Sequence, residues 1–180
     1  MKLKATLTDE KTFGRTLTRI SHEIIEKNET AEGLCLIGIK TRGVPLAKRM
    51  AACIHTFEHQ TIPVGMLDIT GYRDDVPHVG GEESVTGAAQ LPFDVNGKTV
   101  ILVDDVIYTG RTARAAMDVV ISCGRPAKIQ LAVFVDRGHR EFPIRPDYVG
   151  KNIPTSKSEI IRLCMAETDG TDRVLLYTAD

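Results

Sequence analysis

The stretch TVILVDDVIYTGRTARAAMDVV (residues 99–120) combines an apolar run, an acidic pair and a glycine-containing loop. It is the clearest indication of the fold class in this sequence. Its apolar part, Val100–Val103, shows no alternation, which is typical of a strand buried on both faces in a parallel sheet. The carboxyl end of such a strand is where open α/β sheets bind ligands. We therefore expect a ligand site at Asp104, Asp105 and the loop that follows them.

The rest of the chain alternates strand-like and helix-like segments around this stretch. Strands and helices that alternate in this way favour a parallel α/β sheet. A chain of 180 residues without a linker or an internal repeat has the size of one domain. We predict a single α/β domain, residues 1–180, with a central, mainly parallel sheet flanked by helices. Apolar runs predict further strands at 34–39, 64–70 and 128–138, and helical spacing predicts helices at 9–27, 44–57 and 113–122.

Local signals predict where elements begin and how they connect. Thr8 is the expected N-cap of the first helix. Asn96–Gly97, between apolar runs, predicts a hairpin that adds an antiparallel strand to the strand starting at Thr99. The runs at 160–166 and 173–178 predict a closing hairpin. Residues 71–90 lack periodicity and are rich in glycine, and a loop of this length predicts a flap over a site.

The composition limits the classes of partner and compartment. Lys and Arg number 23 against 24 Asp and Glu, so a site for a polyanion must be a local patch. The four cysteines form no C-x-x-C pair, which indicates reduced thiols. The chain shows neither a signal-peptide pattern at its start nor a run of about 18 apolar residues that could span a bilayer. We expect a cytoplasmic protein without a membrane partner.

The loop after the acidic pair indicates the chemistry of the ligand. Residues 109–112 (TGRT) supply backbone amides, two hydroxyls and a glycine at the start of a helix, which together can bind a phosphate. Asp104 and Asp105 would repel that phosphate. Both features fit a ligand with an anionic end and a hydroxyl-rich middle, because carboxylates accept hydrogen bonds from a sugar diol. The pattern favours a phosphorylated ribose.

Two other classes of protein place an acidic pair after a strand. A P-loop enzyme needs G-x-x-x-x-G-K-[ST], and this chain does not contain it. A response-regulator receiver has its acidic pair at the first strand with most of a domain after it, whereas only residues 106–180 follow the pair here. The ribose-phosphate interpretation is favoured over both.

Two further segments can meet anionic groups. The turn IKTRG (residues 39–43) lies between a predicted strand and helix, and its basic residues can bind a second anion or form a solvated turn. Arg73, in the predicted flap, can close over that anion or pair with Asp74 or Asp75 at the surface. Closure of a flap would keep water from an activated sugar.

These motifs carry a resemblance. VILVDDVIYTGRT (residues 100–112) resembles the phosphoribosyl pyrophosphate signature of type I phosphoribosyltransferases. Together with LTRISHEII, IKTRG, DITGYRDD and the segment from GRPAKIQLAVFVDRG to SKSE, it makes the chain resemble the PyrR family, bacterial pyrimidine-operon attenuators with uracil phosphoribosyltransferase activity. The resemblance implies the type I fold with a flexible flap and a small hood, and conversion of uracil and phosphoribosyl pyrophosphate to UMP and pyrophosphate. It also implies Mg²⁺ that arrives with the pyrophosphate and ribose, with no direct protein ligand.

The resemblance also assigns site residues. Asp104, Asp105 and Arg73 are the expected catalytic residues. The ribose-phosphate site is Val103, Asp104, Asp105, Val106, Ile107, Tyr108, Thr109, Gly110, Arg111 and Thr112. The pyrophosphate site is Lys40, Thr41, Arg42 and Gly43, and the uracil and UMP site is Asp136, Arg137, Ile160 and Ile161.

One face of the first predicted helix is not needed for phosphoribosyl transfer. At 100° per residue, several basic and polar residues of the first helix gather opposite its apolar stripe, and charged faces of this kind are often only solvated surface. The resemblance implies UMP-stimulated binding to the leader mRNA of the pyrimidine operon and a homodimer or higher homo-oligomer. The expected RNA-binding residues are Arg15, Thr18, Arg19, His22, Arg140, Arg145 and Lys151.

Other functions remain open on the sequence. A salvage phosphoribosyltransferase without RNA binding and an RNA regulator with vestigial catalysis share the ribose motif. Purine and orotate phosphoribosyltransferases share it as well and differ in the hood that holds the base.

Overall fold

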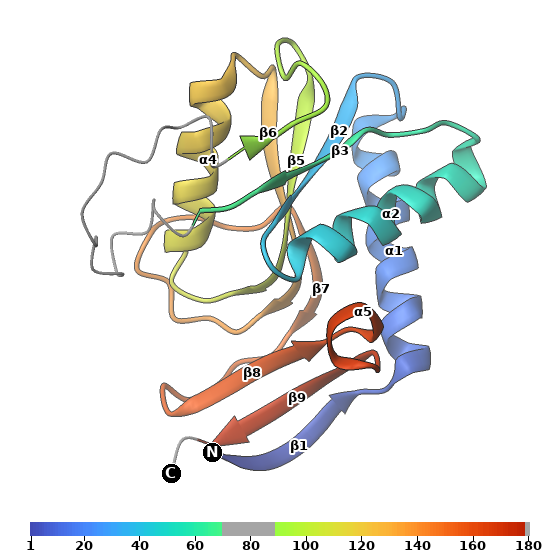
Figure 1. The fold of residues 1–180 in the computed structure, drawn as a ribbon. Helices are drawn as coiled ribbons and strands as arrows, with labels where there is room; N and C mark the ends of the chain where they lie inside the picture. Colours follow the sequence, from blue (N-terminus) through green and yellow to red (C-terminus); the bar gives the residue numbers. More distant parts are fainter. Residues whose placement is uncertain (70–88, 179–180) are drawn as a thin grey trace.

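The computed structural model describes residues 1–69 and 89–178 and confirms the predicted α/β architecture. Its larger sheet has six strands in the order β4-β3-β2-β5-β6-β7, in which only β4 is antiparallel to its neighbour (Figure 1). The glycine-rich flap predicted at 71–90 falls almost wholly outside the described residues, and Arg73 lies there too. The strands are β2 (Leu34–Ile39), β3 (Val64–Leu67), β4 (Ala89–Gln90), β5 (Thr99–Ile107), β6 (Lys128–Asp136) and β7 (Tyr148–Asn152).

Helices cover both faces of this sheet. Helices α1 (Glu10–Asn28) and α2 (Gly43–Glu58) pack on one face and α4 (Arg111–Cys123) on the other (Figure 1). The central strand β5 serves both layers, since Ile101 and Val103 join the cluster under α1 and α2, while Val100 and Leu102 join the cluster under α4. Burial on both faces explains why the sequence of β5 shows no polar alternation.

A second, three-stranded antiparallel sheet forms the hood. It has the order β1-β9-β8, with β1 (Lys2–Thr8), β8 (Glu159–Cys164) and β9 (Arg173–Thr178), and the short helix α5 (Ala166–Asp169) connects β8 to β9. The predicted closing hairpin is therefore confirmed. Strands β1 and β7 were not predicted, because β1 is mostly exposed and β7 is short and contains Gly150.

Three local predictions need correction. The N-cap of α1 is Asp9, whose side chain accepts a hydrogen bond from the Thr12 amide at 2.8 Å, and not Thr8. Asn96–Gly97 forms a turn without a hairpin, because both edges of β5 are occupied by the parallel strands β2 and β6. The strand predicted to end before the acidic pair continues to Ile107, where it still pairs with β6.

No helix in residues 1–69 and 89–178 has the length and apolar composition needed to cross a membrane.

Candidate functional site

A cavity of about 940 Å³ lies at the carboxyl end of β5, where the sequence predicts the ligand site. The parallel strand and the N-terminus of α4 meet there, as expected for an open α/β sheet. Most of the predicted ribose-phosphate residues share this cavity, and Val103 lies just behind it in the core. The lining residues are Lys40, Ile69, Asp104, Asp105, Val106, Ile107, Tyr108, Thr109, Gly110, Arg111, Thr112, Ala113, Leu131, Val133, Arg137 and Glu141.

The acidic pair is partly buried and hydrogen-bonded to its own backbone. The Asp105 amide donates to Asp104 Oδ1 at 2.9 Å, and the Val106 amide donates to Asp105 Oδ1 at 2.8 Å. Burial raises the pKa of the Asp105 carboxyl above its usual range, although hydrogen bonding with Asp104 and the charge of Arg42 act in the opposite direction. The site therefore holds two adjacent carboxyl groups, and burial favours the protonated form of Asp105.

The loop after β5 is shaped by Gly110 and supported from behind. Gly110 is the N-cap of α4 with φ of 93°, a left-handed conformation that favours glycine. The Thr109 carbonyl accepts the amides of Glu141 and Phe142 at 2.9 and 3.0 Å. Arg111 is paired with Glu141 at 2.8 Å. The N-cap Gly110 has no side chain to accept the first amides of α4, and the Arg111 amide donates to Thr109 Oγ1 at 3.4 Å. The amides at a helix N-terminus can bind an anion.

On the hood side, Arg137 connects the loop after β5 to the segment that leads into β8. Its guanidinium lies 4.0 Å from the centre of the Tyr108 ring. It also donates to Thr155 Oγ1 at 3.0 Å and to the carbonyls of Ser156 and Glu159 at 3.2 and 2.6 Å. Arg137 thus lines the cavity while its fork is held by backbone oxygens of the hood.

The other predicted uracil residues surround Arg137 without lining the cavity. Asp136 accepts the Gly138 amide at 2.9 Å and is paired with Arg140 at 2.5 Å. Ile161 packs in the core under α1 and α2, and Ile160 is partly exposed. Among the predicted base-binding side chains, the structure brings only that of Arg137 to the cavity.

The residues of the predicted pyrophosphate turn, 40–43, do not all lie at the cavity. Lys40 lines the cavity and is paired with Asp68 at 3.2 Å, and the Lys40–Thr41 peptide bond is cis. The side chain of Arg42 turns toward the hood, where Asp169 accepts its Nη2 at 3.2 Å. Gly43 lies so close to β5 that an added Cβ would be 2.2 Å from the Val103 carbonyl oxygen.

Sequence reasoning missed the hydrophobic part of the cavity wall and Glu141. Ile69, Leu131 and Val133 come from the neighbouring strands or their ends, so only the sheet order identifies them. Glu141 follows the predicted strand at 128–138, in a segment for which the sequence analysis predicts no helix or strand. Its tie to Arg111 depends on a loop contact that no local pattern encodes.

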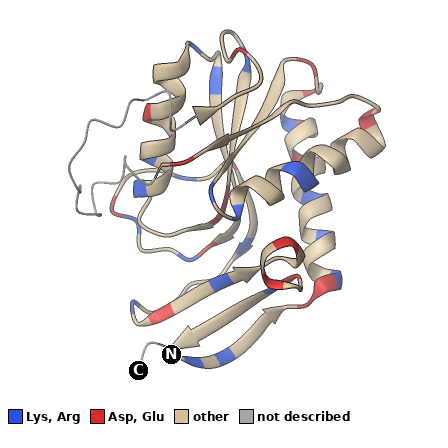
Figure 2. Ribbon diagram, in the orientation of Figure 1, with Lys and Arg blue, Asp and Glu red and all other residues tan. Residues whose placement is uncertain are grey.

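A second hollow runs along the exposed face of α1. This α1 groove has a volume of about 630 Å³ and is lined by Glu10, Lys11, Gly14, Arg15, Thr18, Arg19 and His22. Figure 2 shows basic positions along the same helix. The basic and polar residues predicted to gather opposite the apolar stripe of α1 therefore form one continuous surface.

Two of its side chains are also bound to neighbouring elements. Arg19 is paired with Glu23 and donates to the carbonyls of Val149 and Gly150 in β7. The His22 ring stacks on Phe57 of α2, with centroids 4.0 Å apart. Both residues are nevertheless exposed, as are Lys11, Arg15 and Thr18 beside them.

The three expected RNA-binding residues outside α1 are Arg140, Arg145 and Lys151, and they do not lie together. Lys151, in β7, donates to the Leu7 carbonyl at 3.3 Å, which puts it near the start of α1. Arg145 is exposed in the loop before β7. Arg140 is bound internally, since it donates to the carbonyls of Tyr108 and Ile144, both at 2.9 Å, and pairs with Asp136. We therefore remove Arg140 from the expected RNA-binding residues.

The donor set suits magnesium that arrives with its substrate. In residues 1–69 and 89–178, no three His, Cys, Asp or Glu side chains gather as a metal-binding group. Three carboxylates line the cavity: Glu141, which is paired with Arg111, and the adjacent pair Asp104 and Asp105. Magnesium commonly binds through one or two carboxylates, waters and substrate phosphates, so this pair fits such an ion.

Comparisons with known proteins agree with this geometry. The phosphoribosyl transferase domain family matches residues 5–168. A protein of Thermus thermophilus named Bifunctional protein PyrR is 55% identical over 177 residues, which cover 98% of this chain and 97% of the relative. A protein of Clostridium novyi with the same name is 56% identical over 98% of this chain and 99% of its own.

Solved structures show the same fold at low sequence identity. The hypoxanthine phosphoribosyltransferase of Trypanosoma cruzi matches with a TM-score of 0.74 at 15% identity, over 99% of this chain and 98% of that one. A hypoxanthine-guanine phosphoribosyltransferase from Bacillus anthracis matches with a TM-score of 0.69 at 19% identity, over 98% and 100%. The chain therefore has the type I phosphoribosyltransferase fold and belongs to the PyrR family.

Proposed function

We propose that the protein is a UMP-dependent RNA-binding regulator of pyrimidine operon expression by transcriptional attenuation that also converts uracil and phosphoribosyl pyrophosphate to UMP and pyrophosphate. The observation that carries the proposal is 55–56% identity along nearly the full chain to proteins named Bifunctional protein PyrR. The cavity at the end of β5 supplies the physical basis for the first activity and the α1 groove for the second.

Ribose phosphate binds at the loop between β5 and α4. The amides at the start of α4 and the hydroxyls of Thr109 and Thr112 hold the 5′-phosphate. Asp104 and Asp105 accept hydrogen bonds from the ribose hydroxyls. Gly110 lets the backbone make the left-handed turn that brings these groups together.

Departure of pyrophosphate is assisted electrostatically. Breaking the bond between ribose C1 and pyrophosphate builds negative charge on the leaving group, and preorganised cations lower the energy of that state. Lys40 at the cavity wall and Arg42 in the same turn supply positive charge from the protein. Asp104 and Asp105 are the residues that would hold Mg²⁺, which would supply positive charge to neutralise the diphosphate. Arg73 in the flap is proposed to close on the same group.

Uracil binds between the loop after β5 and the hood. Tyr108 and Arg137 line this part of the cavity, and the backbone near Ile160 lies next to the Glu159 carbonyl that Arg137 holds. Arg137 and backbone groups read the polar edge of the base, and hydrophobic walls hold its faces.

RNA binds along the α1 groove. Arg15 and the neighbouring Lys11 contact phosphates, while Thr18 and the free face of the His22 ring contact loop bases. Lys151 and Arg145 extend this surface, and the protein works as a homodimer or higher homo-oligomer in the cytoplasm.

The test measures both activities on one preparation. UMP formation from uracil and phosphoribosyl pyrophosphate is assayed with Mg²⁺, beside gel shifts of a pyrimidine leader RNA with and without UMP. Turnover together with a UMP-enhanced shift is the expected result. Turnover without a shift would leave a salvage enzyme, and a shift without turnover would leave a nucleotide sensor.

Two variants and a ligand panel sharpen this test. Asp105→Asn is expected to lower kcat by about 100-fold or more, because it removes a charge beside the reacting sugar. Asp118→Asn, an exposed aspartate of α4 paired with Arg114, is the matched control and keeps wild-type kcat. UMP should raise the melting temperature more than GMP or OMP, because only the cognate nucleotide binds the folded state strongly.

A further inference from the structure

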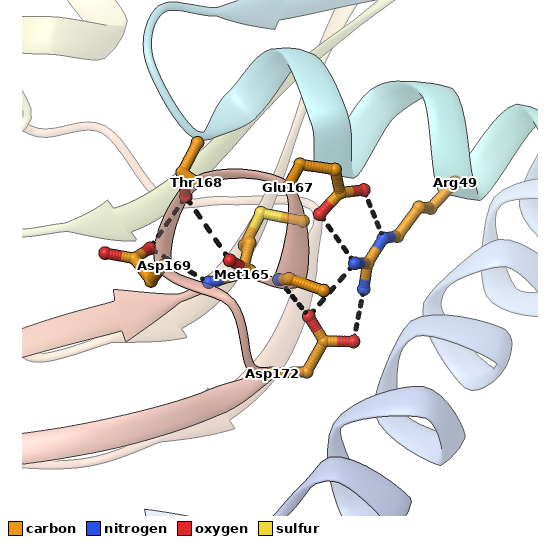
Figure 3. Close-up of polar contacts among 7 residues, drawn as sticks. Arg49, Met165, Glu167, Thr168, Asp169 and Asp172 are labelled. Carbon is orange, nitrogen blue, oxygen red and sulfur yellow. Dashed lines mark hydrogen bonds and ion pairs between the residues drawn. The ribbon is translucent and has the colours of Figure 1, made fainter.

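The short helix α5 lies where the hood meets α2, and it is contacted by Arg49 of α2 and by Arg42 at the N-cap of α2. In Figure 3, Glu167 and Asp172 point toward Arg49, whereas Asp169 points to the other side of the turn. Arg49 donates to Glu167 at 2.8 and 2.6 Å and to Asp172 at 2.6 and 3.0 Å. On the other side, Arg42 Nη2 donates to the two carboxylate oxygens of Asp169 at 3.2 and 3.4 Å.

Asp169 is a carboxylate held in place from several directions. It accepts the Met165 amide at 3.0 Å, Thr168 Oγ1 at 2.7 Å and Arg162 Nη2 at 2.9 Å. Hydrogen bonds from Thr168 and the Met165 backbone, together with Arg162 and Arg42, hold the pKa of Asp169 below its usual range. The carboxylate is thus ionised and fixed in the hood before any ligand binds.

Arg42 stands between this hood carboxylate and the acidic pair of the cavity. It is the N-cap of α2 and belongs to the turn that follows β2. Its charge acts on Asp105, and its Nε is buried without a hydrogen-bond partner in the part of the chain that the structure describes. The backbone next to it is pinned to β5 through Gly43. Backbone and side chain of the same turn are therefore held by two different parts of the molecule.

We propose that Asp169 is a positioning residue for the pyrophosphate end of the reaction, and that it acts by orienting Arg42 from the hood. An arginine presents five donors in a rigid fork, and Asp169 occupies only Nη2. The buried Nε lacks an acceptor, and an oxygen of pyrophosphate bound at the turn 40–43 would supply one. Holding the side chain in advance reduces the conformational entropy lost on binding.

This inference rests on the proposed function, and it differs from a purely structural role for α5. If Asp169 only docked the hood onto α2, its loss would change the affinities for phosphoribosyl pyrophosphate and for UMP by the same factor. If it positions Arg42, its loss weakens phosphoribosyl pyrophosphate, which carries the diphosphate, and leaves UMP, which has none.

The experiment measures dissociation constants of Mg²⁺–phosphoribosyl pyrophosphate and of UMP by calorimetry on the full chain. Asp169→Asn is compared with wild type and with Glu167→Gln, the matched control on the other side of α5. For Asp169→Asn we expect phosphoribosyl pyrophosphate to bind about five- to tenfold more weakly, as for the loss of one charge-assisted contact. UMP affinity should stay within about twofold for every variant. Glu167→Gln should bind both ligands like wild type.

Several results would overturn the inference. Unchanged or tighter binding of phosphoribosyl pyrophosphate by Asp169→Asn would do so, as would equal weakening of both ligands. Asp169→Ser, a smaller neutral residue, is measured beside it and must show the same selective loss even if one variant unfolds. Failure of the wild-type protein to bind either ligand would instead refute the proposed function, and the inference with it.

Discussion

Glycines at the two ligand-facing turns do different work at the residue scale. Gly110 is needed for its left-handed backbone, since its φ is 93°. Gly43 is needed for space, because the start of α2 rests on the Val103 carbonyl. The requirement at Gly110 is local to its loop. The requirement at Gly43 becomes visible only when β5 lies beside the start of α2.

Gly43→Ala tests the close approach of α2 to β5. The new Cβ would lie 2.2 Å from a backbone oxygen, so we expect a loss of about 1–3 kcal/mol in the free energy of unfolding and a higher KM for phosphoribosyl pyrophosphate. Gly14→Ala is the control, because nothing lies within 4 Å of its Cβ position. In a helix interior it should add about 0.5–1 kcal/mol. Urea titrations measure both, and a Gly43→Ala protein as stable as wild type would contradict the contact.

Arg137→Lys tests whether the fork of Arg137, and not only its charge, shapes the base site. Lysine cannot reproduce the simultaneous contacts with Thr155, Ser156 and Glu159. We expect the KM for uracil to rise about tenfold, with little change in the KM for phosphoribosyl pyrophosphate. The exposed Arg145→Lys is the control in the same steady-state assay. Equal increases in both KM values would mean that the substitution damages the whole cavity.

Tyr148 gives the stability a defined dependence on alkaline pH. Burial raises the pKa of Tyr148 to about 12, whereas an unfolded tyrosine titrates near pH 10. Above about pH 10 the unfolded state loses this proton and the folded state keeps it, so the free energy of unfolding falls with pH, by up to about 3 kcal/mol near pH 12. At neutral pH the effect is absent.

Tyr148→Phe should make this alkaline fall shallower. The variant leaves Asn28 and Gln130 without the hydroxyl, so it should be about 1 kcal/mol less stable at pH 8. Urea unfolding at pH 8, 10 and 11 measures the slopes. Other groups titrate in both proteins, so the difference between the slopes belongs to Tyr148. Parallel slopes would show that this hydroxyl does not ionise differently on folding.

At the element scale, α1 separates the two proposed activities on its two faces. Its buried stripe, Phe13, Leu17, Ile20 and Ile24, packs on the sheet. Its opposite face forms the α1 groove and is not part of the cavity wall. The helix can therefore carry a binding surface whose side chains are independent of the reacting groups.

Arg15→Glu should separate the activities experimentally. We expect RNA affinity to fall and the salt dependence of binding to weaken by about one phosphate contact, while kcat for UMP formation stays at its wild-type value. Lys48→Glu, an exposed lysine of α2, carries the same change of charge and is the control. Equal loss of RNA binding in both variants would indicate a general charge effect. Arg19→Ala is less suitable, since Arg19 also ties α1 to β7.

At the scale of the whole molecule, the hood and the larger sheet are joined by the chain and by side-chain contacts. Strand β1 places the start of the chain in the hood, and α1 then crosses to the larger sheet (Figure 1). On the other side, α5 is tied to α2 by Arg42 and Arg49. The cavity and the α1 groove therefore belong to one connected body.

Thermodynamic linkage makes a whole-molecule prediction. If UMP tightens RNA binding about tenfold, RNA must tighten UMP binding about tenfold as well. Calorimetry of UMP with and without saturating leader RNA measures this factor, and gel shifts with and without UMP measure its partner. A leader RNA with its loop sequence scrambled is the control. Unequal factors would show that an unaccounted equilibrium, such as a change of oligomeric state, is coupled to one of the ligands.

Local sequence patterns were sufficient to predict the central strand, the helix that follows it and the ribose-phosphate loop. These depend on neighbouring residues: an unbroken apolar run predicts a buried strand, and glycine with hydroxyls at a helix start predicts an anion site. The same local logic predicted the apolar stripe of α1 and the closing pair of strands. Family resemblance added uracil and RNA, which the local patterns did not specify.

Contacts between residues that are distant in the sequence became known only from the folded structure. The hairpin expected at Asn96–Gly97 does not form, because β2 and β6 already occupy both edges of β5. Arg140 turned inward to Asp136, and Arg42 turned to Asp169, far along the chain. A charged side chain pairs with an opposite charge that lies close to it in the folded state. A strand edge forms hydrogen bonds with the strand that lies beside it. Both outcomes depend on residues that are far apart in the sequence, so the spacing of nearby residues does not predict them.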